Sequence, residues 1–128
     1  MGENIQMSIQ EFANMVKARE TILTIGTDPR GAEILKEKAV FRAVRLTHVP
    51  VKAANLLKQT FLAKGGDAAV SRATAAFSEE YTDVLLLATM RQYRLALQEL
   101  RLQPFGLKRL AEELGAFLLE KEKKPAGI

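Results

Sequence analysis

The chain has 128 residues, and this length is typical of one domain that buries about two thirds of its unfolded surface. It contains no cysteine, which excludes disulfides, thiolate nucleophiles and thiolate metal sites, and its single histidine argues against a zinc site. The 19 basic and 15 acidic residues give a net charge of +4, too even a mixture to indicate nucleic-acid binding.

No apolar run approaches the roughly 20 residues of a membrane span. Residues 1–10 do not have the basic start and apolar core of a signal peptide. We therefore expect a cytoplasmic protein, and no motif indicates a cofactor.

The first part of the chain predicts a helix followed by a short strand. Ser8 and Glu11 have the spacing of a capping box, which predicts a helix over residues 8–19. The β-branched run at residues 21–25 predicts a strand that ends at Gly26.

A short helix over residues 30–36 comes next, with a loop as the alternative. Asp28 predicts its N-cap, and Pro29 is suited to its first turn. Gly31 lies inside the segment and disfavours a helix, so a loop remains the alternative interpretation.

The middle of the chain predicts a strand–helix–strand unit around which the rest packs. Residues 40–49 predict the first strand, from apolar side chains on both of its faces. A helix is predicted over residues 51–64. Pro50 is suited to the start of its first turn, and Gly65 can adopt the left-handed conformation that ends its last turn. A second strand at residues 68–75 would then lie parallel to the first, through a right-handed crossover.

The apolar run at residues 84–88 predicts a central strand covered on both faces. Thr89 and Gln92 have capping-box spacing and predict a helix that starts at Met90. Residues 107–118 repeat their apolar side chains at helical spacing and predict a last, amphipathic helix.

These elements predict an α+β protein: a two-layer sandwich with a mixed sheet of three or four strands, a βαβ unit, and helices mainly on one face. A single domain would occupy residues 1–119, followed by a charged, flexible tail at 120–128. Leu114 and Phe117 on the last helix are expected to pack on the domain's own sheet, with a dimer or partner interface as the alternative.

One group of polar side chains predicts a ligand-binding face. Asn55, Lys58 and Gln59 are three and four residues apart on one helix, and Asp67 and Arg72 follow nearby. The cations Lys58 and Arg72 would neutralise an anion, and the amides of Asn55 and Gln59 would supply directional hydrogen bonds. The simpler interpretation is that these residues form the solvated face of an amphipathic helix.

No residue is predicted to be catalytic or to bind a metal. The sequence at 65–67 follows a helix and precedes a strand, the reverse of a phosphate-binding loop, so it predicts a helix C-cap. No carboxylate or nucleophile has a spacing that would place it beside His48. The acidic residues Glu79, Glu80 and Asp83 lie near one turn, which seldom gathers enough ligands for a metal.

Six blocks of sequence match one known module in order. The blocks are residues 38–41, 53–59, 65–72, 82–86, 88–92 and 102–107. Through these blocks the chain resembles the N-terminal accessory domain of extended dihydropteroate synthases over residues 27–117. In those proteins the module precedes a pterin-binding, TIM-type barrel that joins a dihydropterin pyrophosphate to 4-aminobenzoate in folate synthesis.

A barrel of that type needs about 250 residues, and the Asn-x-Thr-x-Asp-Ser-Phe loop of the pterin enzyme does not occur in the sequence. The resemblance therefore implies a non-catalytic binding or assembly domain linked to folate and pterin metabolism, either free-standing or part of a longer enzyme. Its expected partners are a pterin-binding barrel enzyme or a second copy of itself.

Two other functions remain open. A small transferase or lyase would bind an anionic molecule on the face formed by Asn55, Lys58, Gln59 and Arg72. Nucleic-acid binding rests only on the sequence pI of about 9.5 and would show a steep dependence on salt.

Overall fold

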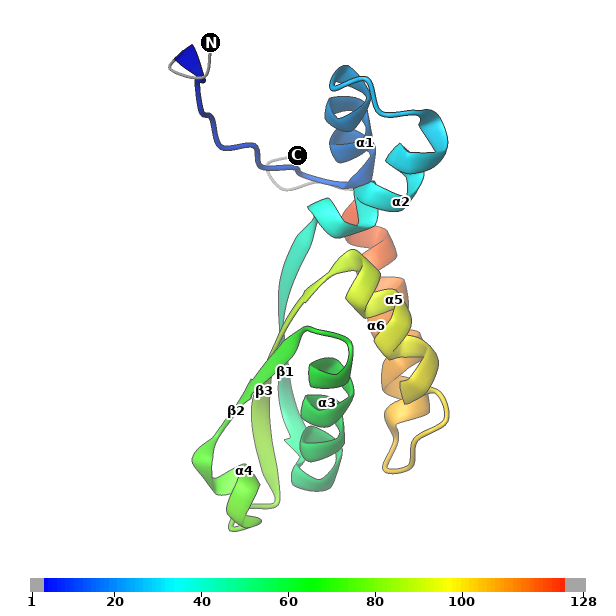
Figure 1. Ribbon diagram of the computed structural model, residues 1–128. Coiled ribbons are helices and arrows are strands. Elements are labelled where there is room, and N and C mark those ends of the chain that lie inside the picture. Colours follow the sequence, from blue (N-terminus) through cyan, green and yellow to red (C-terminus); the bar gives the residue numbers. More distant parts are fainter. Residues whose placement is uncertain (1–3, 124–128) are drawn as a thin grey trace.

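The computed structural model describes residues 4–123, which form an α+β fold and confirm the predicted class (Figure 1). The helices are α1 (Met15–Thr24), α2 (Pro29–Ala39), α3 (Val51–Ala63), α4 (Arg72–Ala76), α5 (Met90–Leu100) and α6 (Leu107–Lys123). The strands are β1 (Phe41–Pro50), β2 (Asp67–Val70) and β3 (Tyr81–Thr89). Within residues 4–123, every helix is too short or too polar to cross a lipid bilayer.

The sheet has three strands in the order β1-β3-β2, and both neighbouring pairs are antiparallel. β1 and β2 therefore run in the same direction, as predicted, but β3 lies between them. The predicted mixed sheet, with adjacent parallel strands, is wrong. β3 pairs along one edge with most of β1 and along the other with the four residues of β2.

The core lies between this sheet and the helices on one of its faces. Ala54, Leu57 and Phe61 of α3 are fully buried against Leu86 of β3. The ring of Phe61 meets that of Tyr93 edge to face, with 5.4 Å between the ring centroids. The apolar stripe predicted for α3 is thus the inner surface of the domain.

The last helix packs on its own domain. Leu114 is 3% exposed and belongs to the same core, which confirms intramolecular packing, although α6 lies mainly against α5 and not directly on the sheet. Phe117 is 55% exposed, so the expectation that it packs on the domain's sheet is wrong. The predicted tail is also too long, since α6 continues to Lys123; residues 124–128 lie outside the described residues.

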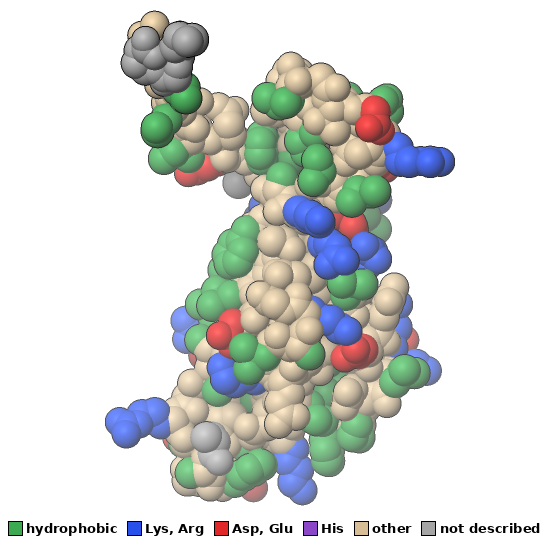
Figure 2. Space-filling view, viewed as in Figure 1, with side chains coloured by type: hydrophobic (Ala, Val, Ile, Leu, Met, Phe, Trp, Pro, Cys, Tyr) green, Lys and Arg blue, Asp and Glu red, His purple; other side chains and the backbone are tan. Residues whose placement is uncertain are grey.

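The N-terminal predictions are wrong in two places. Residues 5–12 have no regular secondary structure, and the side chains of Ile5, Met7 and Ile9 are exposed along an arm that leaves the body of the molecule (Figures 1 and 2). The capping box at Ser8 is not formed; Asn14 caps α1 instead by accepting from the Lys17 N–H at 2.9 Å. The predicted strand at 21–25 is wrong: residues 21–24 end α1, which packs against α2, and Ile25 is its C-cap.

Two segments after the arm follow local signals closely. α2 forms where predicted, with the Asp28 carboxylate accepting from the Gly31 N–H at 2.9 Å. β2 is shorter than predicted because the Ser71 side chain accepts from the Thr74 N–H and starts α4. A serine N-cap thus ends the strand at Val70.

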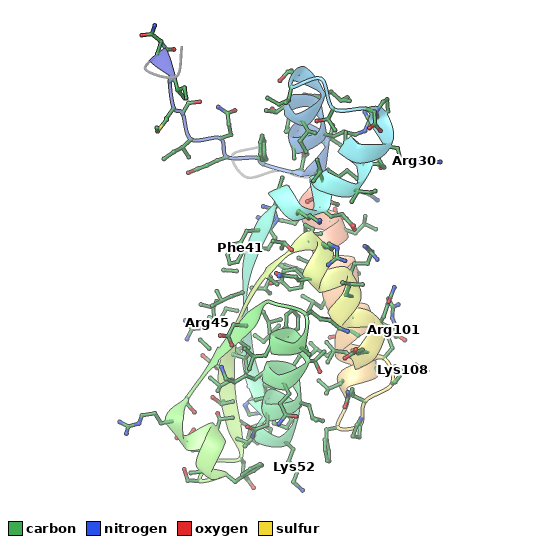
Figure 3. All side chains as sticks on the ribbon, in the orientation of Figure 1. Arg30, Phe41, Arg45, Lys52, Arg101 and Lys108 are labelled. Atoms are coloured by element: carbon green, nitrogen blue, oxygen red, sulfur yellow. The ribbon has the colours of Figure 1, made fainter. Side chains whose placement is uncertain are left out.

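The sheet is covered on one face only. Val84, Leu86 and Ala88 of β3 are buried, whereas Leu85 between them is 37% exposed. Phe41 and Arg45 of β1 point away from α3 and α5 (Figure 3). The prediction that β3 is covered on both faces is therefore wrong, because no element among residues 4–123 lies over the second face.

Candidate functional site

The predicted ligand-binding residues come from α3, β2 and the start of α4. Lys58 Nζ donates to Asp67 Oδ1 and to the Ala68 carbonyl, both at 2.9 Å. Hydrogen bonding by Lys58, and then by the Ala68 N–H, holds the pKa of the Asp67 carboxyl below its usual value. The Lys58 cation therefore ties the middle of α3 to the start of β2.

The amide of Asn55 is also used within the fold. Its Nδ2 donates to the Val51 carbonyl at 3.1 Å and to the Thr74 carbonyl at 3.2 Å. This pair of bonds joins α3 to α4. Two of the five predicted residues, Lys58 and Asn55, thus hold neighbouring elements in place.

The other two predicted side chains face solvent. Gln59 and Arg72 are exposed. Neither makes a hydrogen bond or an ion pair with another described residue. The structure therefore brings Lys58 and Asp67 into contact, whereas Asn55 bonds instead to α4 and neither Gln59 nor Arg72 joins a shared hydrogen-bond network.

An apolar cleft of about 280 Å³ lies at the other end of the domain, between α5, α6 and the α1–α2 pair. Met90, Tyr93, Leu97 and Leu118 form its apolar lining. Burial raises the pKa of the Tyr93 hydroxyl, which donates to the Arg42 carbonyl at 2.8 Å. The Tyr93 hydroxyl therefore joins α5 to β1 through this bond.

Charged groups stand at the rim of this cleft. Arg94 makes two bonds to the Glu37 carboxylate, from Nε at 2.8 Å and from Nη2 at 2.9 Å. Arg101, the exposed C-cap residue of α5, has no ion pair within the described chain (Figure 3). Tyr93 and Leu97 are 1% and 7% exposed and belong to the core, so the inner wall of the cleft is also a surface of the core.

His48 lies at an irregular point of β1 and is not part of an acid–base pair. Its φ of 56° accompanies a register shift between Leu46 and Val49. Its ring stacks on Tyr81 with 3.9 Å between centroids, and its backbone N–H lies 3.4 Å from Asp83 Oδ1. The Arg45 side chain, followed by this N–H, holds the pKa of Asp83 below its usual value.

Among residues 4–123, no three His, Asp or Glu side chains come close enough together to hold a metal ion. Glu79 and Glu80 lie before β3 and Asp83 lies on it, and these three do not form such a group.

Comparison with known proteins finds similarity to parts of two bifunctional proteins. The chain is 32% identical over 107 residues to a bifunctional dihydropteroate synthase/dihydropteroate reductase of Helicobacter pylori, covering 84% of this chain and 28% of that protein. It is 32% identical over 97 residues to a probable bifunctional folylpolyglutamate synthase/dihydropteroate synthase of Halobacterium salinarum, covering 76% of this chain and 12% of that protein. No protein-family model and no solved structure matches the chain.

The chain therefore corresponds to a minor part of each curated relative that it matches. The two relatives differ in one of their named activities and share the other, dihydropteroate synthase. The chain is similar to a segment of bifunctional proteins that contain dihydropteroate synthase.

Proposed function

We propose that this chain is a non-catalytic binding or assembly domain that associates with a dihydropteroate synthase-type enzyme in folate and pterin metabolism. The observation that supports this proposal is the extent of the similarity, which covers 84% and 76% of this chain but 28% and 12% of the relatives. Both relatives contain dihydropteroate synthase, whereas their other named activities differ. We therefore connect the segment that they share with dihydropteroate synthase.

The contacts on α3 are consistent with a non-catalytic role. Lys58 and Asn55, which have the chemistry to bind an anion, donate to groups of their own fold. A ligand at this face would have to replace the bond between Lys58 and Asp67. The polar groups are therefore better explained as links between α3, β2 and α4.

The open face of the sheet is the surface that we assign to the enzyme partner. Its apolar side chains come from all three strands: Phe41 and Ala43, Ala69, and Leu85 and Leu87. Phe41 is 56% exposed, and the Arg45–Asp83 ion pair adds a polar element at one side. An apolar centre with a polar margin is the usual composition of a protein–protein interface.

Binding to the dihydropteroate synthase of the same organism tests this proposal. Sedimentation velocity of the two purified proteins, separately and mixed, should show a complex. Leu85→Glu should weaken it, because the new charge would be buried at the centre of the apolar face. The matched control is Phe117→Glu, which adds the same charge at an exposed position on α6.

Absence of a complex at every concentration, together with no effect of the chain on synthase activity, would contradict the proposal. A complex that Leu85→Glu and Phe117→Glu weaken equally would contradict only the assignment of the open face.

A small transferase or lyase is the second candidate. It is favoured by Gln59 and Arg72, whose exposed side chains keep their hydrogen-bonding capacity among the described residues. Inorganic pyrophosphate or 4-aminobenzoate should then raise the melting temperature, and Arg72→Gln should remove the increase. No increase with either compound would rule out this face as the site for them.

A further inference from the structure

The N-terminal arm has the sequence pattern of a β-strand that has found no sheet. Polar and apolar residues alternate strictly from Asn4 to Gln10, with Ile5, Met7 and Ile9 as the apolar set. These three side chains are 72%, 93% and 88% exposed. A period of two is typical of a strand that buries one face, so this arm carries an apolar row without a covering surface.

The arm makes no backbone hydrogen bond to the rest of the described chain over residues 5–12. It extends away from β1 and from the helices (Figure 1). Its point of departure is held in place, since Arg42 Nη2 donates to the Ala13 carbonyl at 2.6 Å and the Asn14 side chain donates to the Glu122 carbonyl at 3.1 Å. These bonds direct the arm outward from its own molecule.

β1 offers a free strand edge. It is the first strand in the order β1-β3-β2, so one of its edges pairs with β3 and the other pairs with no strand of the described chain. The Met90 N–H donates to the Val40 carbonyl. Because hydrogen bonds alternate along an antiparallel strand, Phe41, Ala43 and Arg45 direct their backbone groups to the free edge.

A groove of about 870 Å³ lies beside the second half of β1, residues 45–50, between it and the first half of α6. Its apolar lining includes Leu46 and Val49 of β1 and Leu107 and Leu110 of α6. A strand added to the edge of β1 would place every second side chain in this groove. The surface therefore fits an extended segment with one apolar face.

We propose that residues 4–12 of a second copy of this chain add to the free edge of β1 as a fourth strand, with Ile5, Met7 and Ile9 in the groove. The lengths agree: the nine residues of the arm span about 30 Å at about 3.3 Å per residue, and the ten residues of β1 span about 33 Å. The exchange of two identical arms gives a closed, two-fold dimer. This pairing uses the edge of the sheet and is independent of the enzyme partner proposed for its open face.

Sedimentation equilibrium of the full chain tests the role of the arm. The wild-type protein should dimerise reversibly, and Ile5→Gln, Met7→Gln and Ile9→Gln should each weaken the dimer about tenfold. The matched controls are Gln6→Ser and Gln10→Ser, on the polar side of the arm, which should leave the dimer unchanged. The melting temperature of the dilute monomer should be the same for all variants, since these side chains are exposed.

Disulfide trapping tests the position of the arm, because the natural sequence contains no cysteine. A Met7→Cys variant mixed with a Thr47→Cys variant should form a mixed disulfide dimer on mild oxidation, since Thr47 is exposed and lines the groove. Met7→Cys mixed with Phe117→Cys, at an exposed site outside the groove, should not.

The double variant with cysteines at both 7 and 47 distinguishes a partner's arm from the chain's own. Linked dimers are expected, and a link only within single chains would overturn the proposed exchange. A wild-type protein that is monomeric at all concentrations, or a dimer that is insensitive to Met7→Gln and Ile9→Gln, would overturn the proposal as a whole.

Discussion

The guanidinium of Arg42 and the carboxylate of Glu122, 80 positions apart in the sequence, lie 3.3 Å from each other and join β1 to the last turn of α6. The side chains are only 20% and 11% exposed. The second carboxylate oxygen of Glu122 accepts from the Met15 N–H at 2.7 Å, at the start of α1. One carboxylate thus connects a strand and two helices.

Glu122→Gln should lower the free energy of unfolding by about 1–3 kcal/mol, because it leaves the largely buried Arg42 without its ionic partner. The buried Nε of Arg42 already lacks a hydrogen-bond partner, so the loss of the Glu122 carboxylate would add to an existing unsatisfied donor. Urea unfolding measures the change. The control is Glu113→Gln, whose partner Arg109 is 86% exposed; it should cost about 0.5 kcal/mol or less. Equal effects of the two substitutions would contradict this prediction.

Leu114→Ala should cost about 2–5 kcal/mol of stability, because it opens a cavity in the core that α6 shares with α5 and the sheet. Phe117→Ala, three positions later on the same helix, should have little effect on unfolding because its ring is exposed. Denaturant unfolding at two protein concentrations measures both. A cost for Leu114→Ala that grows with protein concentration would instead indicate that this residue stabilises an oligomer.

Gly66→Ala should destabilise the fold by about 1–3 kcal/mol through overpacking. A Cβ at this position would lie 2.8 Å from the Leu87 carbonyl oxygen and 3.2 Å from the Ala88 Cβ, both on the central strand β3. Gly106→Ala is the control: it has a φ of 79° but no atom within 4 Å of the added carbon. Gly106→Ala should lower the free energy of unfolding by about 1 kcal/mol only, because alanine is disfavoured in the left-handed backbone conformation. Thermal unfolding that ranks Gly106→Ala as the more damaging variant would refute the close approach at Gly66.

Acid should destabilise the protein partly through Asp67. Its pKa is lowered in the folded state from an ordinary value of 3.8, so its contribution is present above that pH and is lost as the pH falls through the lower folded value. Asp67→Asn should therefore have a lower melting temperature at neutral pH and a flatter decline below about pH 4. Glu112→Gln, at an exposed position on α6, should keep the wild-type profile.

Part of the fall in melting temperature at acid pH should remain in Asp67→Asn. The pKa values of Glu33 and Asp83 are lowered as well, each by bonds to basic side chains. A melting profile between about pH 2 and pH 6 that is identical for Asp67→Asn and the wild type would show that the bond to Lys58 does not contribute in solution.

The features that the sequence predicted well depend on residues a few positions apart. The capping box of Thr89 and Gln92 is formed with both of its bonds, and Asp28 caps α2 as expected. Gly65 adopts a φ of 89° at the end of α3. Caps, first-turn prolines and helical apolar stripes act within about one turn of helix, so local sequence is sufficient to specify them.

The candidate site was predictable only as a set of residues. Periodicity placed Asn55, Lys58 and Gln59 on one side of α3, but it could not show that Lys58 bonds to Asp67 or Asn55 to the Thr74 carbonyl. Those bonds depend on how β2 and α4 return to α3. The apolar cleft beside Tyr93 was not predicted because its walls come from helices at both ends of the chain.

The strand order and the covered face of the sheet were decided by tertiary contacts. Residues 21–25 have the composition of a strand, yet residues 21–24 continue α1, which packs against α2. β3 lies between β1 and β2, so β1 pairs with a strand that is not the next one along the chain. The entropic cost of closing the longer connection between β1 and β3 rises only slowly with its length, so local sequence does not fix this choice of neighbour. The local sequence therefore determines where most helices begin and end, whereas the choice of strand neighbours, and of the sheet face left open, depends on contacts between segments that are distant along the chain.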